Sequence, residues 1–140
     1  LSALAPGVRV TRVIDRDERT DEEIRTLHAQ QVRVLSLRTI ESYLLDDSVM
    51  KAMCESFGQP ELAPQLLEAK AEALRNSIAN GGPVDDLKRP AGDIYNAAKR
   101  LFPTRKLGSD KRAFMKAICA PLIRPGVPTY VVLQKDVFGE

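Results

Sequence analysis

Two stretches near the start of the chain alternate apolar and polar residues as β-strands do. In residues 8–14, valine and isoleucine alternate with arginine and threonine, and residues 32–37 form a second short apolar run. Between them, Thr20 and Glu23 have the spacing of a capping box, which predicts a helix from residue 21 to about residue 30. A strand–helix–strand unit of this length predicts a right-handed crossover that joins two parallel strands.

After residue 45 the apolar residues recur at helical spacing. The pattern predicts helices over about 49–57, 61–79, 92–102 and 110–123. In the tail, the β-rich run 129–133 fits a strand or a helical turn equally well. We therefore expect one structural unit with an α/β part (residues 1–45), a helical insertion covering the sheet (46–82) and a basic helical part (83–140). The fold class is α/β, with a short parallel sheet and a predominantly helical C-terminal two-thirds.

Three acidic residues are candidates for a metal site. Asp15 and Asp17 follow the first strand with one residue between them, so in an extended chain their carboxylates project to the same side. The parallel crossover places Glu41 at the same edge of the sheet. Carboxylate oxygens in such a cluster suit Mg²⁺ or Mn²⁺. The alternatives stay open: Asp15 and Asp17 as polar loop residues, and Glu41 as a helix N-terminal acid.

Composition adds an uneven distribution of charge. The formal net charge is only +2, but residues 88–124 hold ten basic and two acidic residues, which gives that segment a net charge of +8. Such a segment can contact phosphates, although its charges could equally be matched by the acidic first half. The two cysteines, Cys54 and Cys119, fit buried free thiols in a cytoplasmic protein. No apolar run approaches the roughly 20 residues that span a bilayer, so no membrane partner is expected.

Two motifs in the first third of the chain resemble a known family. V-I-D-R-D-E at residues 13–18 and L-R-T-I-E-S-Y-L-L at residues 37–45 resemble the second half of a Toprim domain. The resemblance is greatest to the Toprim nuclease domain of the overcoming-lysogenization-defect (OLD) family of ATP-dependent endonucleases. The glutamate that ends the first strand of such domains is missing here. The resemblance therefore implies a partial, Rossmann-like Toprim fold from a longer protein, and a fragment that is inactive alone.

The resemblance also implies an activity and its residues. Toprim nucleases hydrolyse phosphodiester bonds with bound Mg²⁺ or Mn²⁺, which would make Asp15, Asp17 and Glu41 metal ligands. The family's further catalytic acid and lysine would be Asp93 and Lys111, beside Glu41. Four basic residues would contact the DNA backbone: Arg38, Lys99, Arg100 and Arg112. An upstream ATPase domain, a homodimer and a role in phage or plasmid defence belong to the same expectation.

Two other interpretations remain. The chain could be a degenerate, non-catalytic Toprim-like module that binds nucleic acid through its basic segment, or a protein partner through its helices. It could also be another α/β fold with acids at a strand end, such as a receiver-like or phosphohydrolase domain. Neither of those folds predicts the segment at residues 37–45, which disfavours this last interpretation. His28, the single histidine, is interpreted as a surface or packing residue.

Overall fold

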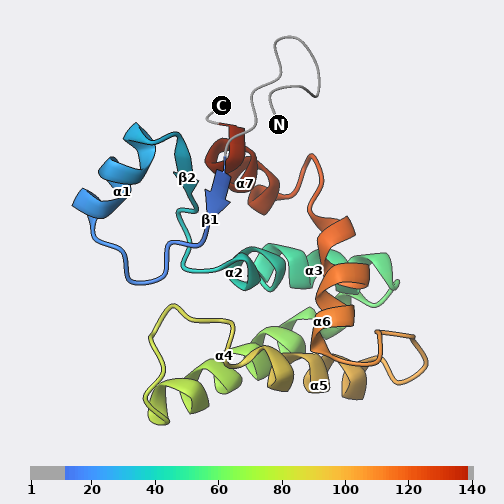
Figure 1. Ribbon diagram of the computed structural model, residues 1–140. Coiled ribbons are helices and arrows are strands. Elements are labelled where there is room, and N and C mark those ends of the chain that lie inside the picture. Colours follow the sequence, from blue (N-terminus) through green and yellow to red (C-terminus); the bar gives the residue numbers. More distant parts are fainter. Residues whose placement is uncertain (1–11, 139–140) are drawn as a thin grey trace.

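The computed structural model describes residues 12–138 and opens with a β-α-β unit (Figure 1). Strand β1 spans Arg12–Ile14, helix α1 spans Asp21–Ala29, and strand β2 spans Val32–Val34. The strands are parallel, with Val13 beside Arg33. Both sides of the predicted capping box at Thr20 are present. The parallel crossover is thus confirmed, while residues 8–11 of the predicted first strand lie outside the described residues.

The second strand is shorter than predicted, because it ends at Val34 and not at Leu37. The Leu35 N–H still donates to the Ile14 carbonyl oxygen at 3.0 Å. Strand β1 ends at Ile14, so the following residues have no ladder partner. Ser36 instead donates from its backbone N–H (3.0 Å) and its hydroxyl (2.6 Å) to the Asp136 carboxylate. The chain therefore turns at this point and leads into the next helix.

The helices predicted over 49–57, 61–79 and 92–102 are confirmed with small shifts of their ends, and a short helix at residues 40–44 precedes them. Helix α2 spans Ile40–Leu44, α3 spans Asp47–Ser56, the 3₁₀ turn η1 spans Pro60–Leu62, α4 spans Ala63–Ala79 and α5 spans Ala91–Leu101. Asp46 caps α3 by accepting the Ser48 N–H at 3.1 Å. Gly58 follows α3 with φ +72°, a conformation that glycine adopts without strain.

The predicted helix over 110–123 is not continuous. It consists of α6 (Lys111–Phe114), a π-helical turn η2 (Met115–Cys119) and a 3₁₀ turn η3 (Ala120–Leu122). Pro121 explains the break, because proline has no N–H to donate to the carbonyl four residues earlier. Asp110 caps α6, since its Oδ1 accepts the Ala113 N–H at 2.8 Å. The tail forms helix α7 (Pro128–Phe138), which settles the open choice for residues 129–133.

The main apolar core lies among the helices, and the small sheet lies to one side of it (Figure 1). Fully buried side chains of the core include Val49, Met53, Leu66 and Ile94. The sheet contacts α1 and α7, so these helices take the covering role that we expected of residues 46–82. The described part of the chain is therefore a mixed α/β protein with a two-stranded parallel sheet and a predominantly helical remainder.

Candidate active site

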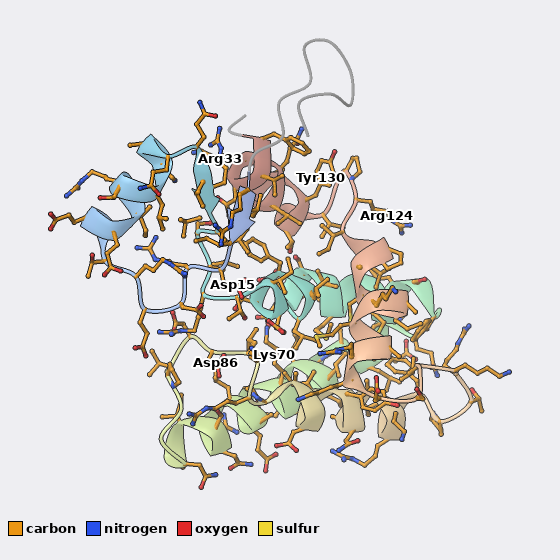
Figure 2. All side chains as sticks on the ribbon, in the orientation of Figure 1. Asp15, Arg33, Lys70, Asp86, Arg124 and Tyr130 are labelled. Atoms are coloured by element: carbon orange, nitrogen blue, oxygen red, sulfur yellow. The ribbon has the colours of Figure 1, made fainter. Side chains whose placement is uncertain are left out.

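The loops that follow the two strands are held together at one edge of the sheet. Asp15, partly buried, comes directly after β1, and its Oδ1 accepts the backbone N–H of Ile40 at 3.2 Å. Two residues later, the Asp17 N–H donates to the Arg38 carbonyl oxygen at 2.9 Å. Figure 2 shows Asp15 where the chain leaves β1, beside the start of α2. The shared edge that the crossover predicted is thus present, with Asp15 at its centre.

Asp17 does not have the conformation that the strand pattern predicted. Its φ is +47°, in the left-handed region that aspartate tolerates in turns, so the extended geometry does not continue past β1. Its Oδ2 lies 3.6 Å from Nη1 of Arg19, and the same nitrogen donates to the Asp15 carbonyl oxygen at 2.5 Å. The two carboxylates are therefore neighbours across a tight turn and not successive side chains on one strand face.

The electrostatics of Asp15 show which charges share this edge. Burial raises the pKa of Asp15, and so do the negative charges of Asp17 and, to a smaller extent, Glu41. The hydrogen bond from Ile40 and the positive charge of Lys88 act in the opposite direction. The charges of Asp17 and Glu41 thus oppose ionisation of Asp15, and the charge of Lys88 offsets part of their effect.

This cluster is not a complete protein cage for a metal ion. Within residues 12–138, no three His, Cys, Asp or Glu side chains come together as ligands of one ion. Mg²⁺, however, is commonly bound by one or two carboxylates and completes its coordination with waters and substrate phosphates. Asp15 and Asp17, with the charge of Glu41 nearby, fit an open site of that kind.

Lys88 is the residue near Asp15 that the sequence did not single out. It lies in the segment between α4 and α5, which rises toward the loops after the strands (Figure 1). The buried Asp86 carboxylate accepts the N–H groups of Lys88 (3.0 Å) and Arg89 (3.2 Å) and so fixes this turn. The local sequence signal for this turn is Asp86 itself, because an aspartate that binds N–H groups two and three residues later is typical of an Asx turn.

Arg38 holds the same segment in place. Its Nε lies 2.8 Å from Asp85 Oδ1, and its Nη1 lies 3.9 Å from Glu18. The hydrogen bond to Asp85 raises the pKa of Arg38 further above its usual value. The guanidinium is engaged within the protein, so its geometry fits positioning of the loops better than the predicted phosphate contact.

The other predicted catalytic residues, Asp93 in the first turn of α5 and Lys111 at the start of α6, lie elsewhere in the fold. Asp93 lines a cavity of about 200 Å³ with Ser77 of α4, with Asn80 directly after that helix and with Arg89. The side chain of Lys111 passes close to Gly92, the second residue of α5. In the described part of the chain, no hydrogen bond or ion pair connects either side chain to Asp15 or Asp17. The charge of Glu41 acts on Asp15, whereas Asp93 and Lys111 have no such link to the aspartates in the described residues.

Apart from Lys88, whose charge acts on Asp15, the basic segment carries charge that the described part of the fold leaves unmatched. None of its ten basic residues forms an ion pair with any residue in 12–138, so the acidic half does not neutralise them by direct pairing. Arg105 stacks on the Phe57 ring at 4.7 Å, and Lys99 lies 5.2 Å from the Tyr95 ring centre. Arg100 and Arg112, predicted to contact DNA, are exposed.

Comparison of the chain with protein-family models, with curated proteins and with solved structures finds no match. Between residues 12 and 138 there is also no helix both long enough and apolar enough to cross a membrane. The fold and the acidic edge define a mixed α/β protein with a carboxylate cluster after its first strand. Any function must be argued from the chemistry of that cluster and of the charges around it.

Proposed function

We propose that this chain is the nuclease domain, or part of it, of a Toprim-type DNA endonuclease that depends on Mg²⁺ or Mn²⁺ and is coupled to an ATPase. The observation that carries the proposal is the cluster of Asp15, Asp17 and Glu41 at the carboxyl edge of two parallel strands. The charges of Asp17 and Glu41 disfavour an ionised Asp15 and so cost stability, and such costs are typical of sites selected for chemistry. The resemblance at residues 13–18 and 37–45 supports the same function.

The residues of the site have distinct parts in this proposal. Asp15 and Asp17 would bind the metal ion, with Glu41 binding a second ion or orienting a water. The bound metal would polarise the phosphodiester and lower the pKa of the attacking water. Lys88, held by the Asp86 turn, would neutralise phosphate charge in the place that we expected for Lys111.

Substrate binding would fall to the unmatched charges of the basic segment. Lys99, Arg100 and Arg112 would contact the phosphate backbone of DNA without reading its sequence. Because each contact releases condensed counterions, binding should weaken steeply as salt is raised.

The direct test is calorimetric titration of Mn²⁺ into wild-type protein and into Asp15→Ala/Asp17→Ala. The control is Glu55→Ala/Glu72→Ala, which removes the same charge from exposed helical positions. We expect binding to be lost in the first variant and retained in the control, with circular dichroism showing that both are folded. Equal binding in all three proteins would remove the aspartates from the metal site.

A second candidate function is a non-catalytic nucleic-acid-binding module. It is favoured by the absence of a three-residue ligand group within residues 12–138 and by the unmatched basic segment. Nicking of supercoiled plasmid in Mn²⁺ separates the two candidates. Salt-sensitive DNA binding with no metal binding and no nicking would favour the module, whereas nicking that disappears in Asp15→Ala/Asp17→Ala supports the nuclease.

A further inference from the structure

A cavity of about 510 Å³ lies between α2, the π-helical turn η2 and α7. This volume falls in the range of sites that hold small molecules, roughly 300–1,000 Å³. Most of the wall is apolar and is formed by Ile40, Leu44, Met115, Ile123 and Leu133. A planar, weakly polar group would therefore lose few hydrogen bonds to water when it enters the cavity.

Three charged side chains line the same cavity: Glu41 from α2, Arg112 from α6 and Lys116 from η2. Arg112 and Lys116 are exposed, and neither pairs with an acid in the described part of the chain. The cavity thus combines an apolar wall with two available cations and one carboxylate. A ligand that has an apolar planar part and an anionic part matches this combination.

The cavity adjoins the acidic edge of the sheet. The backbone N–H of Ile40 binds Asp15 Oδ1, while the side chain of Ile40 lines the cavity. The next residue, Glu41, also lines it, and its charge contributes to the raised pKa of Asp15. A ligand bound here would therefore lie next to the proposed metal site.

One wall of the cavity has an irregular backbone. Met115 and Lys116 belong to the π-helical turn η2, and Ala120 follows it. Turns of this type are rare and occur frequently at functional sites. Pro121 gives the local cause of the irregular turn, and the turn forms part of the cavity wall.

We propose that this cavity binds one unpaired nucleotide of a single-stranded nucleic acid. The base would lie against the apolar wall, Arg112 and Lys116 would contact the adjacent phosphate, and Glu41 could accept a hydrogen bond from an exocyclic amino group. The inference rests on the proposed nucleic-acid function and names its substrate class. A duplex can fill the cavity only by unstacking a base, so single strands and unpaired ends bind preferentially.

The test is fluorescence anisotropy with a fluorescein-labelled 15-nucleotide single strand and with its duplex, both without divalent metal. Ala120→Trp fills the cavity from an exposed position, and Ala117→Trp adds the same side chain at an exposed position outside the cavity wall. For charge, Lys116→Ala is compared with Lys106→Ala, which removes an exposed lysine of the same basic segment.

We expect wild-type protein to bind the single strand at least tenfold more tightly than the duplex. Ala120→Trp should abolish that preference and Ala117→Trp should retain it, while Lys116→Ala should weaken single-strand binding several-fold more than Lys106→Ala. Equal binding of both DNAs, or equal effects of the two tryptophans, would overturn the proposal. So would a concentration-dependent dimer that Ala120→Trp dissociates without changing DNA binding, since the cavity would then be an interface between copies.

Failure here is distinguishable from failure of the proposed function. Mn²⁺ binding and its loss in Asp15→Ala/Asp17→Ala do not depend on the cavity, and the anisotropy assay does not depend on metal. Metal binding without single-strand preference would overturn only the cavity proposal. Single-strand preference without metal binding would support the cavity in a non-catalytic module.

Discussion

Replacing Asp15 with asparagine tests whether the acids at the sheet edge serve chemistry more than stability. Burial and the charges of Asp17 and Glu41 raise the pKa of Asp15, which means that the folded protein disfavours the ionised carboxylate. Asparagine keeps an oxygen that can accept the Ile40 N–H, which donates to Asp15 at 3.2 Å, but it carries no charge. We therefore expect Asp15→Asn to raise the free energy of unfolding at pH 7.

The size of the effect follows from the charges involved. The substitution removes repulsion from Asp17 and Glu41 and loses the attraction to Lys88. Partly exposed charge pairs of this kind are worth about 0.2–1 kcal/mol each, and relief of the cost of burial adds to the gain, so we expect a net gain of roughly 0.5–1 kcal/mol.

The direction of the pKa shift determines how the stability gain of Asp15→Asn changes with pH. The folded pKa of Asp15 is raised above the usual 3.8, so the carboxyl's contribution to stability is full below that value and is lost as pH rises through the folded pKa. The advantage of asparagine is therefore present at pH 7 and declines as the pH falls to about 3, because wild-type Asp15 takes up a proton over that range.

Urea denaturation at both pH values measures this difference. With a slope of about 2 kcal/mol per molar urea, the expected gain moves the midpoint up by roughly 0.4 M at pH 7. The control is Asp47→Asn, which breaks the 2.7 Å ion pair with Lys70 Nζ and removes an acid from the first turn of α3, and should destabilise. A loss of stability in Asp15→Asn as large as in this control would refute the reasoning, because the Asp15 carboxylate would then be structural.

Three further outcomes are expected. Tyr43→Phe should lower the free energy of unfolding, measured by urea denaturation, by about 2–3 kcal/mol, because the buried Tyr43 hydroxyl donates to the Asp136 carboxylate. The control is Tyr130→Phe, whose hydroxyl has no partner within residues 12–138 and which should cost less than about 0.5 kcal/mol. Burial would raise the pKa of Asp46, but its hydrogen bonds from neighbouring hydroxyl and N–H groups hold the pKa below the usual 3.8. The stabilisation from the Asp46 carboxylate is therefore present above pH 3.8 and is lost as the pH falls further. When folding is followed during acid titration, Asp46→Asn should lack this part of the loss of stability. Burial raises the pKa of Cys119 to about 12, so iodoacetamide at pH 8 should modify it only after urea unfolds the chain, as followed by mass spectrometry.

The elements that the sequence predicted correctly depend on local signals. Thr20 and Glu23 form a capping box because the two groups are three residues apart, whatever surrounds them. Apolar spacing placed the helices that became α3, α4 and α5, since a helix buries a fixed face. The parallel pairing of β1 and β2 followed from the length of their connection.

Part of the candidate site followed from the same reasoning. The sequence placed Asp15 and Glu41 at one edge because parallel strands end together, and the charge of Glu41 does reach Asp15. It misjudged Asp17, since the extended geometry stops at Ile14 and the chain turns with a positive φ. It also overlooked Lys88, because a lysine 73 positions from Asp15 gives no local sign of its place.

The tertiary structure alone decided which side chains meet. Residues 129–133 are rich in β-formers, yet they form part of α7, whose Thr129 hydroxyl donates to Asp46 and whose Asp136 binds Ser36 and Tyr43. Propensity is worth tenths of a kcal/mol per residue, and buried hydrogen bonds and packing outweigh it. The sequence by itself determined the order of the elements and the acids after the first strand. The fold decided that Lys88 would stand beside those acids and that Glu41 would share a cavity with Arg112, because both depend on how loops and helices far apart in the chain pack together.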